Sequence, residues 1–169
     1  MMTTFRRIAL AALAALPLVV AAQDIPTRKS GLWEITTRLD RLQTPIGPLQ
    51  QCIDGSTDEV WKQQALDRGD CSKPAFTHTG DTYSFKVVCK SRETTATSEG
   101  VITGDMDNAY HGEILTRFDP PVRGQSEAKV TIDAKWIGAC KPGMKPGEML
   151  MPKGITINPA ELRGLRQPN

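Results

Sequence analysis

The sequence predicts an α+β fold, in which a twisted antiparallel β-meander of about six strands packs on one helix. Runs of alternating apolar and polar residues recur along the chain, a pattern typical of strands with one buried face. The connections between these runs are short, which favours antiparallel neighbours. Residues 56–66 have the pattern of an amphipathic helix instead. The alternative is a small lipocalin-like β-barrel, in which the strands close on themselves.

Six stretches are predicted as strands. In residues 31–41, Trp33 and Ile35 fall on one side and Glu34 on the other. The clearest stretch, 127–137, places five apolar residues on one side: Ala128, Val130, Ile132, Ala134 and Trp136. The other four predicted strands cover residues 73–78, 82–89, 93–103 and 108–118.

Ser56 and Glu59 have the spacing of a capping box, which predicts a helix from residue 56 to about 66. Its apolar stripe would consist of Val60, Trp61, Ala65 and Leu66. Two prolines and a glycine within residues 43–48 predict a loop, and the Pro-Gly pairs after Lys141 predict turns. Asn158 and Pro159 predict the start of a last short helix.

An export signal is expected over residues 1–22. Arg6 and Arg7 precede an apolar run from residue 8 to residue 22, which ends on small residues. A membrane span needs about 20 apolar residues, and Pro17 interrupts this shorter run. We therefore expect a signal peptide cleaved after Ala22, a periplasmic location and no integral membrane span in the mature chain. The expected organisation is then a single disulfide-bonded β-rich domain over 23–157 and a tail over 158–169.

The charge of the mature chain argues against nucleic acid as a partner. The whole chain carries 21 basic and 19 acidic residues, and removing residues 1–22 takes away two arginines and no acid. The remaining formal charge is zero, so no electrostatic attraction to nucleic acid is expected.

Four cysteines, Cys52, Cys71, Cys89 and Cys140, are expected to form two disulfides, because an even number in an exported chain is typical of a disulfide framework. A zinc site or a thiol oxidoreductase is disfavoured, because the chain has no Cys-x-x-Cys. A turn near Gly80 brings Cys71 close to Cys89, which leaves Cys52 for Cys140. By loop closure, the short bridge contributes about 3 kcal/mol and the long one about 4 to 5 kcal/mol.

The register of that hairpin has two solutions. A three-residue turn opposes Cys71 to Cys89, whereas a two-residue turn opposes Phe76 to Phe85 and packs the aromatic rings better. A bulge near Pro74 would reconcile the two registers.

Several short motifs lie along the chain in the order that is typical of one known family. They are Gly31-Leu32-Trp33-Glu34, Gln51-Cys52, Cys89, Gly104-Asp105, Tyr110, the run from Ala134 through Trp136-Ile137-Gly138-Ala139-Cys140-Lys141-Pro142-Gly143, Lys145-Pro146-Gly147-Glu148 and Pro152-Lys153-Gly154. In these motifs the chain resembles a Gram-negative bacterial family of small exported proteins catalogued as a domain of unknown function. The resemblance implies a periplasmic location and two disulfides, and it implies that the tail after Cys140 belongs to the domain. It implies no catalytic residue.

No catalytic constellation and no cofactor or metal site is predicted. His111, Glu113 and Arg117 share one strand face, but that face is opposite Tyr110 and is expected to be solvated. Met144, Met149 and Met151 gather in the tail and could bind Cu(I) as a remote alternative. Methionines more often fill gaps in packing.

Two functions remain open from the sequence. In the first, the chain is a non-catalytic accessory or interaction protein of the cell envelope. In the second, the concave apolar face of the sheet binds a small hydrophobic ligand. Both use the same candidate residues, which are Trp33, Phe85, Ile132 and Trp136. A filled core would favour the first function, and an open apolar cavity of a few hundred Å³ would favour the second.

Overall fold

A computed structural model describes residues 25–59 and 70–159 of the chain. The predicted signal peptide, most of the predicted helix over 56–66 and most of the tail over 158–169 lie outside these ranges.

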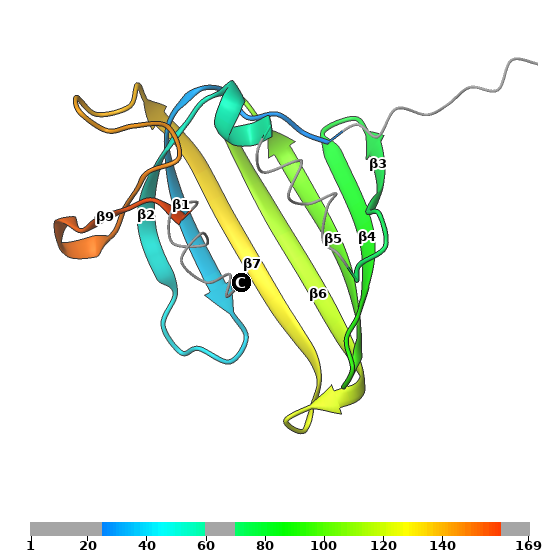
Figure 1. Cartoon of the computed structure of the whole chain (residues 1–169). Coiled ribbons are helices and arrows are strands. Elements are labelled where there is room, and N and C mark those ends of the chain that lie inside the picture. Colours follow the sequence, from blue (N-terminus) through cyan, green and yellow to red (C-terminus); the bar gives the residue numbers. More distant parts are fainter. Residues whose placement is uncertain (1–24, 60–69, 160–169) are drawn as a thin grey trace, which may run out of the picture.

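The described chain forms one open antiparallel sheet in the order β3-β4-β5-β6-β7-β1-β2-β8-β9 (Figure 1). Its strands are β1 (Gly31–Leu39), β2 (Ile46–Ile53), β3 (Ala75–Thr79), β4 (Thr82–Lys90), β5 (Thr95–Asp105), β6 (Ala109–Val122), β7 (Gln125–Gly138), β8 (Met149–Leu150) and β9 (Thr156–Ile157), with a short 3₁₀ helix at Pro152–Gly154. The predicted α+β class is therefore wrong, because within the described ranges no substantial helix packs on the sheet. The closed barrel is wrong as well, since β3 and β9 are separate edges.

The six predicted strands exist, and their pairing explains why the alternation is so regular. In β7, Ala134 lies opposite both Ile35 of β1 and Tyr110 of β6, and Ile132 lies opposite Gly112. Side chains of like polarity therefore meet across neighbouring strands, which produces an apolar face and a polar face. We call the face that carries Trp33, Ile35, Ile102, Tyr110 and Ile132 the apolar face, and its opposite the polar face.

The β3–β4 hairpin contains both of the registers considered from the sequence. A two-residue turn at Gly80 and Asp81 opposes Phe76 to Phe85. Further along, an isolated bridge opposes Cys71 to Cys89, one residue out of step with the hairpin. The shift falls around Pro74, which has no N–H with which to continue the ladder. The bulge near Pro74 thus reconciles the two registers.

Strands β2, β8 and β9 were not predicted. The expected loop over 43–48 includes the start of β2, where the register against β1 shifts between Ile35 and Thr37 around Gly47 and Pro48. A bulge tolerates a proline, so the residues that predicted a loop do not interrupt the strand. Beyond Lys141, β8 pairs with β2 and β9 pairs with β8, so this part of the tail extends the sheet.

The described start of the predicted helix is a helical turn at residues 55–59. Its cap is Asp54 rather than Ser56, because Oδ1 of Asp54 accepts the backbone N–H of Thr57 at 2.8 Å. Ser56 donates its hydroxyl to the same oxygen, and these bonds lower the pKa of Asp54. The turn lies at the end of the sheet where β1 begins (Figure 1).

Two cysteine pairs lie at disulfide distance, and they are the pairs favoured from the sequence. Cys52 joins Cys140 across 88 residues, and Cys71 joins Cys89 across 18 residues. Two disulfides suggest an oxidising, exported environment. Within the described ranges, we find no helix with the length and apolar character needed to span a bilayer.

Candidate functional site

The described residues do not completely fill the apolar face. The core gathers at one end of it, where Trp33 and Ile53 are fully buried against Ala134. Beyond that core lies a cavity of ≈ 240 Å³, lined by Pro26, Arg28, Ile35, Thr37, Asp58, Phe85, Ile102, Met106, Tyr110, Gly112, Ile114 and Ile132. These residues come from five strands, the segment before β1, the β5–β6 turn and the helical turn at 55–59.

Two glycines on neighbouring strands of the apolar face show why the cavity lies where it does. Gly100 on β5 is covered by the ring of its cross-strand partner Phe85, so a Cβ at Gly100 would collide with that ring. No described side chain covers Gly112 on β6 in this way, and the nearest described atom to a Cβ built there is Cγ1 of Ile102 at 3.7 Å. The missing side chain at Gly112 therefore leaves space in the sheet face.

One wall of the cavity belongs to residues 25–30, which run along the end of the sheet before β1 begins (Figure 1). We call this segment the strap. Two indoles hold it, because Trp33 Nε1 donates to the carbonyl of Lys29 at 2.8 Å and Trp136 Nε1 donates to the carbonyl of Ser30 at 3.1 Å. The Lys29 ammonium also lies 4.0 Å from the centre of the Trp136 ring. These contacts fix the backbone that carries Arg28.

The polar end of the cavity is a buried ion pair between Arg28 of the strap and Asp58 of the helical turn. Nη2 and Nε of Arg28 lie 2.5 and 3.0 Å from Oδ1 of Asp58, and the Arg28 backbone N–H donates to Oδ2 at 2.6 Å. Only 15% of the Arg28 side chain and 3% of the Asp58 side chain are exposed. Such a pair is costly to break, because each charge would be left buried alone.

Tyr110 completes this end of the cavity. Burial acts most strongly on the pKa of Arg28 and lowers it, but the interactions with Tyr110 and Asp58 outweigh burial and raise the pKa above its ordinary value. Arg28 is therefore a permanent cation, held beside an apolar cavity by one carboxylate and one phenol.

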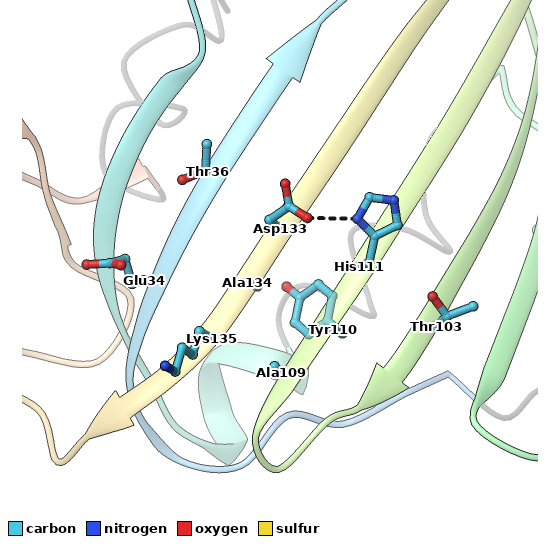
Figure 2. A pocket seen from close by; sticks show the side chains of 9 residues that line it. All are labelled: Glu34, Thr36, Thr103, Ala109, Tyr110, His111, Asp133, Ala134 and Lys135. Carbon is cyan, nitrogen blue, oxygen red and sulfur yellow. Dashed lines mark hydrogen bonds and ion pairs between the residues drawn. The ribbon is translucent and has the colours of Figure 1, made fainter.

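A second hollow, of ≈ 460 Å³, lies on the polar face over β1, β6 and β7 (Figure 2). In it, Nδ1 of His111 lies 2.7 Å from Oδ1 of Asp133, and Arg38 binds the other carboxylate oxygen. These two bonds, that of His111 first, lower the pKa of Asp133. His111 and Asp133 are nearly half exposed and Arg38 shares the carboxylate, so the arrangement is a network of hydrogen bonds and ion pairs at the surface.

The structure divides the four candidate residues into two pairs. Phe85 and Ile132 line the cavity. Trp33 is fully buried in the core, and Trp136 packs against that core. Of the tail methionines, Met149 belongs to β8 and Met144 lines a hollow together with Leu150. Within the described ranges, no cluster of three histidine, cysteine or acidic side chains could hold a metal ion.

Sequence reasoning missed Arg28, Asp58 and Gly112. A lone glycine inside an alternating strand indicates a close approach or an open site, so Gly112 carried a usable signal. Arg28 and Asp58 carried none, because 30 residues separate them and neither belongs to a strand.

Residues 28–140 match the model of a family that is described as a protein of unknown function (DUF3617). This match covers more than half of the chain, so the chain belongs to that family. The family description identifies no catalytic activity. No curated protein matches the chain, and no solved structure matches it either.

Proposed function

We propose that this DUF3617 protein binds a small hydrophobic molecule in the cavity over Gly112, on the apolar face of its sheet. The observation that carries the proposal is the cavity itself, which is walled by Ile102, Ile132 and other apolar side chains and opens where Gly112 lacks a side chain. An envelope accessory that acts only through protein contacts needs no such space. The sequence left both functions open, and the cavity favours ligand binding.

The size of the cavity limits the ligand. A cavity of about 150 Å³ lined by apolar side chains holds one benzene molecule. In proportion, ≈ 240 Å³ has room for about ten non-hydrogen atoms. A butylbenzene, a short-chain ketone or a comparable fragment fits this volume, whereas a complete phospholipid does not.

Calorimetric titration of the oxidised protein with butylbenzene tests the proposal, together with a matched pair of variants. Gly112→Leu places four carbon atoms in the cavity, and its Cβ has ordinary contact distances to Ile102 and Ile132. Val101→Leu also enlarges an apolar side chain of the same region, but Val101 lies on the polar face and is 44% exposed.

We expect the wild type and Val101→Leu to bind butylbenzene equally. Gly112→Leu is expected to bind butylbenzene about tenfold or more weakly. The leucine side chain would take the place of at least two methylene groups of the ligand, which would then lose their contacts with the cavity wall. Equal binding by both variants, or no binding by the wild type up to about 1 mM, would contradict the proposal.

The location is part of the same proposal. The chain is exported, is cleaved after Ala22 and acts in the periplasm of a Gram-negative bacterium without a catalytic activity of its own. The apolar run over 8–22 and the two disulfides support export. Amino-terminal sequencing of protein recovered from a periplasmic extract should begin at Gln23, and a sequence that begins at Met1 would contradict cleavage. Native mass spectrometry of the same material would show whether a small molecule, a copper ion or a protein partner is bound.

A further inference from the structure

We infer that the ligand carries one uncharged oxygen, such as a hydroxyl or a carbonyl, which Arg28 binds at the polar end of the cavity. This inference rests on the proposed function. A hydrogen bond to Arg28 would distinguish hydrophobic ligands by their polar group, whereas contact with the apolar wall alone would not.

The first step concerns the donors of Arg28. A guanidinium has five N–H groups in a planar fork. Two of them, on Nε and Nη2, bind Asp58, and a further polar contact joins Arg28 to Tyr110. These contacts with described residues leave donor capacity on a side chain that lines the cavity. A ligand oxygen placed there would accept a charge-assisted hydrogen bond in a site with little water.

The second step concerns charge. Asp58 is 97% buried, as its exposed fraction of 3% implies, and it already balances the charge of Arg28. A carboxylate ligand would bring a second negative charge close to Asp58 in a region of low dielectric constant, where like charges repel strongly. An uncharged oxygen accepts the same hydrogen bond without that repulsion. The geometry therefore favours an alcohol, ketone or ester over a fatty acid.

The third step concerns position. Tyr110 and Arg28 lie at one end of the cavity, and Phe85 and Ile114 belong to its apolar wall. A ligand with one oxygen at its end and a hydrocarbon body satisfies both regions together. A hydrocarbon without oxygen fills the apolar part only.

Three probes of similar size separate these contributions: butylbenzene, 4-phenylbutan-1-ol and 4-phenylbutyrate. For the wild type at neutral pH, we expect the alcohol to bind at least as tightly as butylbenzene, although water solvates its hydroxyl. We expect 4-phenylbutyrate to bind about tenfold or more weakly than the alcohol. Tighter binding of 4-phenylbutyrate than of the alcohol would overturn the inference.

A double variant, Arg28→Met with Asp58→Leu, replaces both charges with apolar groups of similar volume and so avoids an unpaired buried charge. The ratio of its affinity for the alcohol to its affinity for butylbenzene should fall about tenfold or more relative to the wild type. The matched control is Arg38→Met with Asp133→Leu, which removes the same residue types from the polar face and should leave both affinities unchanged.

The Nη–H resonances of Arg28, which include the donors that Asp58 leaves free, give a second measurement that needs no variant. The alcohol should shift them by more than butylbenzene does. Equal shifts with the two probes, or a double variant that keeps the ratio of the two affinities, would overturn the role of Arg28. Failure of butylbenzene itself to bind the wild type would overturn the proposed function, so the two failures are distinguishable.

Discussion

The two faces of the sheet are built from alternate residues of the same strands, yet the ion pairs of one face are exposed and that of the other is buried. On the polar face, ion pairs run from strand to strand: Lys86 and Arg117 both bind Glu99, and Lys129 binds Glu113. Their side chains are about half exposed. Among the described residues, the apolar face has one ion pair, between Arg28 and Asp58, and it is almost completely buried beside a cavity.

This difference shows where to look for function in a sheet whose other ion pairs, among the described residues, lie on the polar face. Exposed pairs contribute little to stability because water already solvates both partners. Burying an ion pair costs the desolvation free energy of two charges. Replacing both residues with apolar ones often leaves the stability of a protein unchanged or higher. The Arg28–Asp58 pair is therefore better explained by what it can bind than by the fold that it stabilises.

The largest expected effect comes from breaking the buried pair. Asp58→Ala leaves Arg28 buried without a counter-charge and should lower the free energy of unfolding by about 3–5 kcal/mol. Asp133→Ala on the polar face should lower it by about 1 kcal/mol or less, because its partners are exposed. Urea denaturation of both variants makes the comparison, and equal effects would remove the distinction between the faces.

A smaller effect separates the two glycines of the apolar face. Gly100→Ala forces the Phe85 ring to move and should destabilise the protein by about 1–3 kcal/mol. Gly112→Ala meets no close atom and should stabilise it by about 0.5–1 kcal/mol, since glycine costs more backbone entropy than alanine in a strand. Thermal unfolding of the pair tests this, and destabilisation by Gly112→Ala would mean that the space over Gly112 is already occupied.

The smallest effect is the pH dependence of the polar face. Hydrogen bonds from Lys86 and then Arg117 lower the pKa of Glu99, and the bond from His111 is the largest of those that lower the pKa of Asp133. A carboxyl whose pKa is lower in the folded state contributes stability that is present above its unfolded value, 4.5 for Glu99 and 3.8 for Asp133. That contribution is lost as the pH falls through the folded pKa.

The melting temperature of the wild type should therefore decrease between pH 5 and pH 3, and Glu99→Gln combined with Asp133→Asn should decrease less over the same range. An identical pH dependence in the two proteins would show that these polar-face pairs contribute nothing.

The sequence predicted the strands well and the architecture poorly, for physical reasons that particular residues illustrate. Alternation is a local property, so β7 could be predicted from Ala128 through Trp136, and the Phe76–Phe85 pairing was one of the two registers predicted for the turn near Gly80. The number of strands depended on non-local pairing. β2 contains Pro48, and β8 has two residues, so neither resembles a strand until a neighbour pairs with it.

Only part of the candidate site was predictable. Phe85 and Ile132 follow from the alternation, because they lie on the same face as the core. Arg28 and Asp58 pair because the strap and the helical turn meet at one end of the sheet. This contact is non-local, so the order of residues along the chain gives no signal of it. The indole bonds from Trp33 and Trp136 that hold the strap are equally non-local.

The most direct test of a ligand site on the apolar face is an NMR measurement of contacts between butylbenzene and labelled isoleucine methyl groups. Bound butylbenzene should show intermolecular NOEs to the isoleucines that line the cavity, which are Ile35, Ile102, Ile114 and Ile132. Ile137 and Ile155 are 40% and 59% exposed elsewhere on the molecule and serve as internal controls. NOEs to the first group alone are the predicted result, and NOEs to the exposed pair, or to no isoleucine, would contradict a ligand site in this cavity.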